Sequence, residues 1–188
     1  MTTTNRRTPV RERLLETADR LFYGEGIHAV GIDRIIAESR VAKSTMYVHF
    51  RTKEDLVEAY LRRRHAAIAD HVQATLDQRT DGYRERVLAV YDALEGSLCS
   101  TDWRGCPFTN AAAEYPAHEG IRSAVRDWRD WLHSLFDRLL GPRAEKEYLV
   151  PALIQLVDGS MTAAHLDRDT GATSVARRVA ATLLDTAV

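Results

Sequence analysis

The chain has 188 residues, of which 45% are hydrophobic and 28% are charged, and its formal net charge is -1 at pH 7. This composition indicates a soluble globular protein with either one domain or a small domain fused to a larger one. The sequence contains no run of 18 apolar residues, and its first seven residues lack the apolar core of a signal peptide. We therefore expect neither a membrane span nor secretion, and a cytoplasmic location.

The first predicted element is a helix that begins near Val10 and ends at Gly24 and Gly26. Its apolar residues recur at intervals of three and four, which places them on one face of a helix. A glycine can end a helix because it adopts a left-handed conformation at no steric cost. The residues of this stripe are Val10, Leu14, Ala18, Leu21 and Phe22.

Residues 31–53 predict two short helices joined by a tight turn. The first helix carries an apolar stripe of three isoleucines, at positions 32, 35 and 36, and Asp33 favours its N-terminal end. Val41 is an isolated apolar residue of the kind that fills the angle between two helices. The second helix runs from about Lys43 to His49 and is expected to bury Met46 and Phe50.

The opposite side of the second helix presents side chains that donate hydrogen bonds, and no acidic residue occurs between Ala42 and Lys53. Both properties are typical of a helix that lies among DNA phosphates. Two of these side chains, the Tyr47 phenol and the His49 imidazole, have an alternative role as half-buried packing groups. The donors on this side are Lys43, Ser44, Thr45, Tyr47 and His49.

The distribution of charge agrees with a DNA-binding N-terminal part. Residues 1–53 carry ten Lys and Arg against six Asp and Glu, whereas residues 54–188 carry sixteen against twenty-one. The excess of positive charge in the first segment directs DNA to that end of the chain.

The remaining sequence predicts only helices. Thr52 and Asp55 form a capping-box-like start to a long helix, and a break at residues 78–82 separates it from four or five more. These include a short helix at about residues 107–115, a long one ended by Gly141 and Pro142, and two more at about residues 144–167 and 174–187.

The segment from Val41 to Leu56 resembles the turn, the recognition helix and the start of the fourth helix of the TetR family of bacterial regulators. The resemblance implies an all-α fold, in which an N-terminal three-helix helix-turn-helix domain joins a helical ligand-binding and dimerisation domain through a long fourth helix. The corresponding ranges are 1–53 and 54–188. It also implies a homodimer that represses transcription and leaves a palindromic DNA operator when a small molecule binds.

Family positions that approach bases or phosphates match residues 43, 44, 45, 47 and 49 of the recognition helix and Lys53 at the start of the next helix. The chain departs from the family pattern at three positions. Gly31 stands where Ser or Thr is usual, Arg40 where Gly is usual, and Ala42 where Ser is usual. Arg40 could supply a phosphate contact in place of the missing hydroxyls, so it joins the predicted DNA-binding set.

The last two predicted helices are the expected dimer surface, since their small residues allow close packing into a four-helix interface. Burial inside a single subunit is the alternative for the same stripes. The first stripe comprises Leu149, Leu153, Leu156 and Val157, with Ala152, Ser160, Ala163 and Ala164 nearby; the second comprises Val175, Val179, Thr182, Leu183 and Thr186.

The segment around Cys106 resembles a pattern of one TetR subgroup, in which the helix that follows borders an effector pocket. Apolar and polar side chains in the second half of the chain could line such a small-molecule site, although aromatic residues at helical spacing also form plain core. The candidate pocket residues are Tyr91, Cys106, Phe108, Asn110, Glu114, Trp128, Trp131, Asp158, Met161 and His165.

Other kinds of chemistry have little support in the sequence. Cys99 and Cys106 are not spaced as zinc ligands, and the chain has no phosphate-binding loop or nucleophile elbow, so we expect no metal, no cofactor and no enzyme. A helix start just after Cys106 could activate its thiol. The alternatives to a small-molecule receptor are therefore a cysteine redox sensor and a DNA-binding dimer with a protein-docking distal domain.

Overall fold

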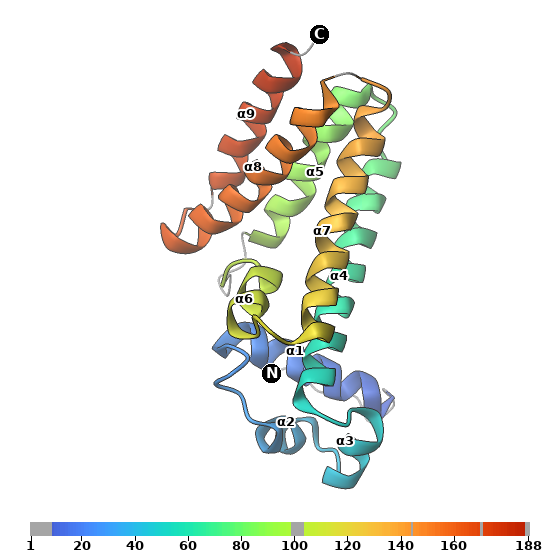
Figure 1. Cartoon of the computed structure of the whole chain (residues 1–188), viewed down its shortest axis with the longest axis vertical. Coiled ribbons are helices and arrows are strands. Elements are labelled where there is room, and N and C mark those ends of the chain that lie inside the picture. Colours follow the sequence, from blue (N-terminus) through green and yellow to red (C-terminus); the bar gives the residue numbers. More distant parts are fainter. Residues whose placement is uncertain (1–8, 99–103, 144, 170, 187–188) are drawn as a thin grey trace. The chain divides into compact units, whose positions relative to one another are not determined.

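The structure is a computed structural model that describes residues 9–98, 104–143, 145–169 and 171–186. These residues form nine α-helices and no strand, which confirms the predicted all-α class (Figure 1). The last two helices agree with the predicted ranges to within two residues at each end. In chain order the helices are α1 (Val10–Glu25), α2 (Ile32–Ser39), α3 (Lys43–His49), α4 (Lys53–Asp77), α5 (Tyr83–Leu98), α6 (Pro107–Glu114), α7 (Glu119–Leu140), α8 (Lys146–Leu166) and α9 (Ala172–Thr186).

The helices divide between two compact units. Unit 1 comprises Met1–Arg64 and Pro107–Val125, and unit 2 comprises His65–Cys106 and Arg126–Val188. Unit 1 thus continues past residue 53 into α4, and it includes α6 and the first turns of α7. The structural division differs here from the sequence ranges 1–53 and 54–188, because chain segments that are distant in sequence pack into one unit.

In unit 1, helix α1 packs against both α2 and α3. As the sequence predicts, Val41, Met46 and Phe50 are buried, whereas Ile32 and Ile36 are only half-buried. Burial of these side chains joins three short elements that would not be stable helices in isolation. The fully buried aliphatic side chains of unit 1 include Leu14, Leu21, Ile35, Met46, Leu56 and Leu61.

Local signals in the sequence set two helix ends in unit 1. Gly26 follows α1 with φ of 97°, a conformation that a side chain would strain, and its N–H donates to the Phe22 carbonyl. At the start of α4, the Asp55 N–H donates to Thr52 Oγ1 and the Thr52 N–H donates to Asp55 Oδ2, at 3.0 and 3.1 Å. The predicted capping box is therefore present, with Asp in place of Glu.

A largely buried cation connects α4 to α1. The Arg64 guanidinium donates to both oxygens of Asp19, at 2.5 and 3.3 Å, and its Cζ lies 3.9 Å from the centroid of the Tyr23 ring and 5.5 Å from that of Tyr60. The Arg64 side chain is only 24% exposed. Two hydrogen bonds to a carboxylate and two aromatic faces together compensate for the loss of its hydration.

Unit 2 is built on contacts among α5, α8 and α9. The buried Tyr91 hydroxyl donates to the Leu153 carbonyl at 2.8 Å and so ties α5 to α8. Arg84 donates to both Asp185 oxygens, at 2.6 and 3.0 Å, and ties α5 to α9. These three helices therefore pack together, and polar contacts hold α5 to both α8 and α9.

The apolar stripe of α8 lies inside the subunit. Leu149, Leu153 and Val157 are each at most 1% exposed, so the intramolecular alternative is correct for them. By length and composition alone, Glu147–Leu166 could span a membrane, but a core helix of a soluble protein passes the same test. On α9, by contrast, Val175 and Val179 remain 48% and 42% exposed.

We predict that Arg64→Ala lowers the free energy of unfolding by about 2 kcal/mol, because it leaves the Asp19 carboxylate without its partner in a partly buried site. Urea denaturation of the full chain measures the effect. The control is Arg62→Ala, which removes an exposed pair with Glu58 one helical turn away and should cost about 0.5 kcal/mol or less. Equal losses in the two variants would show that burial of Arg64 contributes nothing.

Candidate nucleic-acid interface

A left-handed residue shapes the turn between α2 and α3. Arg40 has φ of 54° and ψ of 43°, and the next N–H, that of Val41, donates to the Ile36 carbonyl at 3.3 Å. This conformation explains why glycine is usual here, since it strains a residue with a Cβ. The Arg40 carbonyl accepts a hydrogen bond from Arg13 of α1 at 3.4 Å, which helps to hold the turn. The Arg40 side chain is left exposed.

The outer face of α3 is exposed over its whole length. Lys43, Ser44 and His49 are exposed and Tyr47 is 45% exposed, whereas Thr45 is half-buried. Burial of Met46 and Phe50 on the other side fixes this orientation. The structure thus brings the predicted recognition-helix residues together on one exposed face of α3, which itself carries no acidic residue, with Thr45 at its edge.

Val48 lies on the same face and is missing from the predicted set. Its side chain is 79% exposed, although it is apolar. Its sequence position could have predicted this exposure. Val48 lies between Tyr47 and His49, on a helix whose buried side is occupied by Met46. An exposed apolar group on a reading helix is suited to contact with a thymine methyl group, which only the major groove presents.

Lys43, at the start of α3, is held by a carboxylate in the structure. Its Nζ donates to Asp33 Oδ1 at 2.9 Å, and this hydrogen bond raises the pKa of Lys43. The side chains are 63% and 83% exposed, so the pair is weak and DNA phosphates can compete for the ammonium group. The contact holds Lys43 beside α2 in the structure.

A network of ion pairs fixes the outer side of α2. Arg34 binds Glu25 of α1 and donates to Glu38 at 2.8 Å, while Arg20 of α1 donates to Glu38 at 2.5 Å. Hydrogen bonds from Arg20 and Arg34 lower the pKa of Glu38. Arg20 and Arg34 are thus neutralised by glutamates of α1 and α2. The basic side chains of α3 and of the turn lie outside this network.

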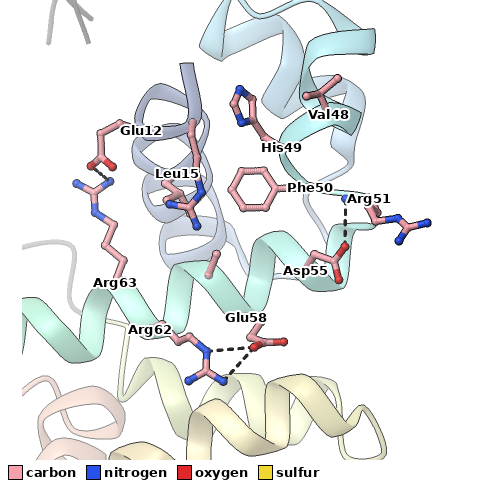
Figure 2. A pocket seen from close by; sticks show the side chains of 12 residues that line it. Glu12, Leu15, Val48, His49, Phe50, Arg51, Asp55, Glu58, Arg62 and Arg63 are labelled. Carbon is pink, nitrogen blue, oxygen red and sulfur yellow. Dashed lines mark hydrogen bonds and ion pairs between the residues drawn. The ribbon is translucent and has the colours of Figure 1, made fainter. Parts of the chain in front are cut away.

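A groove of about 650 Å³ lies next to the end of α3, between α1 and α4 (Figure 2). Its basic residues differ in their partners. Figure 2 shows Arg63 directed at Glu12 and Arg62 at Glu58, in ion pairs of 2.6 and 3.0 Å. The exposed residues lining it include Arg11, whose Cζ lies 5.2 Å from the centroid of the Phe50 ring, together with His49 and Arg51.

Lys53 differs from the other predicted DNA contacts because it is half-buried. Its Nζ lies 6.0 Å from the centroid of the Phe22 ring. Burial lowers the pKa of Lys53 below its usual value, and the opposing effect of the Glu54 and Glu114 carboxylates is smaller. Part of its role is therefore structural, at the start of α4.

The predicted pocket residues fall into both units, and some of them form hydrogen bonds with other groups of the protein. In unit 1, Phe108 is buried, Asn110 is half-buried, and the Glu114 carboxylate accepts hydrogen bonds from the N–H groups of Ile27 and His28.

In unit 2, Tyr91, Cys106, Trp128 and Met161 are buried and His165 is exposed. Asp158 accepts hydrogen bonds from Arg129 at the surface.

Two of the predicted pocket residues do lie together in unit 2. The rings of Trp128 and Trp131 stack with centroids 5.1 Å apart, and the His65 ring lies edge-on to them at 5.7 and 5.5 Å. Among the described residues, no group of three His, Cys, Asp or Glu side chains is placed to hold a metal ion. Cys99 lies outside the described residues.

Comparison with known proteins finds relatives that are described as transcriptional regulators. A model described as "Bacterial regulatory proteins, tetR family" matches residues 14–60. The chain is 31% identical over 117 residues to the HTH-type transcriptional repressor NemR of Escherichia coli (strain K12), an alignment that covers 61% of this chain and only 59% of NemR. It is 33% identical over 132 residues to the HTH-type transcriptional regulator LmrA of Bacillus subtilis, with coverage of 63% and 66%.

Among solved structures, the chain is similar to SCO4454, a TetR-family transcriptional regulator from Streptomyces coelicolor. The two are 38% identical, the TM-score is 0.86, and the match covers 96% of this chain and 92% of that one. This similarity extends over both units, whereas the family model covers only α1 to the first turns of α4.

We predict that a hydroxyl at position 31 restores a missing helix cap. Gly31 has extended dihedrals, with φ of -81°, α2 has no side-chain cap there, and no neighbouring atom lies within 4 Å of a Cβ added to Gly31. The Gly31→Ser variant should exceed the matched Gly31→Ala variant in unfolding free energy by about 1 kcal/mol. Thermal or urea denaturation measures the difference; equal stabilities would mean that α2 gains nothing from a cap.

Proposed function

Because the chain belongs to the TetR family of bacterial transcriptional regulators, we propose that it is a cytoplasmic, homodimeric repressor that leaves a palindromic operator when a small molecule binds its distal domain. The observation that carries this proposal is the exposed, acid-free face of α3. A surface of hydrogen-bond donors without carboxylates suits DNA, whose backbone repels negative charge. Repression is proposed by analogy with NemR, which is named a repressor.

The proposed contacts divide by chemistry. Lys43, Ser44 and Tyr47 read base edges or adjacent phosphates, with Val48 as an apolar neighbour. The other positions of the set, Arg40, Thr45, His49 and Lys53, hold the backbone. This division is supported by exposure, because the half-buried side chains of Thr45 and Lys53 have less freedom to reach across a groove.

A dimer is part of the proposal because a palindromic site is read by two helices one turn of DNA apart. The helices α8 and α9 carry the proposed interface, although the buried stripe of α8 is not part of it. Its support is the presence of four exposed apolar side chains, between 42% and 72% exposed: Tyr148 and Leu166 of α8 and Val175 and Val179 of α9. Exposed apolar side chains of this kind favour a region that is covered in the assembled protein.

The proposed small-molecule receptor is unit 2. Its support is the aromatic cluster of Trp128, Trp131 and His65, since stacked aromatic rings with a polar neighbour suit a planar organic ligand. A cysteine sensor has less support, because the Cys106 side chain is only 8% exposed.

We predict that the full chain selects an inverted repeat from random DNA, with half-site centres about 34 to 36 Å apart. On that site, Lys43→Gln should weaken binding and reduce the slope of log K against log salt by about 1, because one phosphate contact is lost. Arg40→Gly should do the same while relieving the left-handed strain. Arg138→Gln, an exposed change on α7, is the control. Selection of a single unrepeated site, or an unchanged slope in both variants, would contradict the proposal.

We also predict that Val175→Asp combined with Val179→Asp converts the dimer to a monomer, because two carboxylates would be buried without partners at the interface. Analytical ultracentrifugation measures the change, and operator affinity should fall with it. Ala117→Asp, at an exposed position of unit 1, is the control and should remain dimeric. A double variant that still sediments as a dimer would place the interface elsewhere.

A further inference from the structure

Glu114, the last residue of α6, binds the backbone between α1 and α2. Its Oε1 accepts a hydrogen bond from the Ile27 N–H at 3.0 Å, and its Oε2 accepts one from the His28 N–H at 2.5 Å. The Glu114 carbonyl lies 2.7 Å from His28 Nε2, and the next ring, that of Tyr115, stacks on His28 with centroids 4.5 Å apart. One end of α6 thus makes four contacts with two consecutive residues.

The two N–H groups find their acceptor outside their own segment, and the one at Ile27 is part-buried. Ile27 and His28 follow the end of α1 at Gly26, so their N–H groups are not bonded within a helix. The Ile27 side chain is 2% exposed and anchors the segment, whereas His28 is exposed. A carboxylate that spans two adjacent N–H groups makes two charge-assisted hydrogen bonds and fixes the direction of the backbone as well as its position.

The rigidity of the segment matters because it leads directly into the reading elements. After His28, only two residues precede Gly31 and the start of α2. Val30 is fully buried, and its N–H donates to the Ile27 carbonyl at 3.4 Å, which makes the connection a tight turn. A displacement of Ile27 and His28 is therefore passed to α2 with little opportunity for a flexible linker to absorb it.

Glu114 lies on a segment that comes from a later part of the sequence than the rest of unit 1. Helix α6 begins at Pro107, immediately after Cys106 of unit 2, yet it belongs to unit 1. The chain returns to unit 2 within α7, after Val125. Residues 107–125 are thus an insertion into unit 1 that is covalently joined to unit 2 at both ends.

We propose that Glu114 is a positioning residue for DNA recognition: its carboxylate fixes the connection between α1 and α2, and so holds α2 and α3 in the arrangement that reads the operator. This rests on the proposed DNA-binding function. Both carboxylate oxygens of Glu114 accept hydrogen bonds within unit 1.

The test compares Glu114→Gln with wild type in the full chain, on the DNA site that the wild type selects and on a scrambled duplex. A glutamine oxygen can accept one of the two N–H groups, but its amide group faces the other with a donor. Specific affinity should fall about tenfold, while affinity for the scrambled duplex and the salt slope stay unchanged, because no phosphate contact is lost. Amide hydrogen exchange at Ile27 and His28 should become faster.

Two further variants sharpen the result. Glu114→Asp keeps the charge but is one methylene shorter, so it should retain part of the specific affinity. Glu16→Gln removes an exposed carboxylate of α1 and should behave as wild type. A purely structural role predicts instead that specific and scrambled affinities fall together with the melting temperature, and this result would overturn the proposal.

Unchanged specific affinity in Glu114→Gln would overturn it too, even with faster exchange at Ile27 and His28. A wild-type protein that selects no DNA site at all would instead refute the proposed function. The two failures are therefore distinguishable, because the second needs no variant.

Discussion

Burial of one side of α3 is the constraint on which the proposed DNA-binding surface depends. The helix has only seven residues and neither end is capped by a side chain, so it cannot persist without tertiary contacts. Met46, fully buried within α3, and Phe50, directly after it, anchor the helix, and Val41 fills the angle before it. Because the buried side is fixed at these points, the remaining side chains have no alternative to facing outward.

The positive charge around this surface depends more on which arginines are neutralised by ion pairs than on a large excess of basic residues. Arg20 of α1 and Arg34 of α2 are matched by glutamates of the same two helices, whereas the outward face of α3 carries no carboxylate. Lys43 is the intermediate case, since its exposed pair with Asp33 can exchange for a phosphate. A chain with a net charge of -1 can thus present a locally positive face to DNA without being a basic protein.

Sequence patterns correctly predicted the features that depend on residues close to one another in the chain. Helix existence, the glycine end of α1 and the Thr52 capping box follow from residues within a few positions of one another. The same reasoning could not distinguish core from interface on α8, because a stripe at helical spacing is compatible with both. Nor could it assign Glu114, whose partners lie 86 and 87 residues earlier in the chain. Exposed Val48 was missed since an apolar residue on a short helix is ordinarily expected to be core.

Unit 1 differs in composition from a sequential domain that ends at residue 53. A segment ending at residue 53 would lack Leu56 and Leu61, which are fully buried in this unit, and Arg64, which is held by Asp19. It would also lack Glu114, so the N–H groups of the first connection would lose their acceptor. The packing of α2 and α3 is therefore completed by residues from α4 and α6, which are distant in sequence and belong to the same unit.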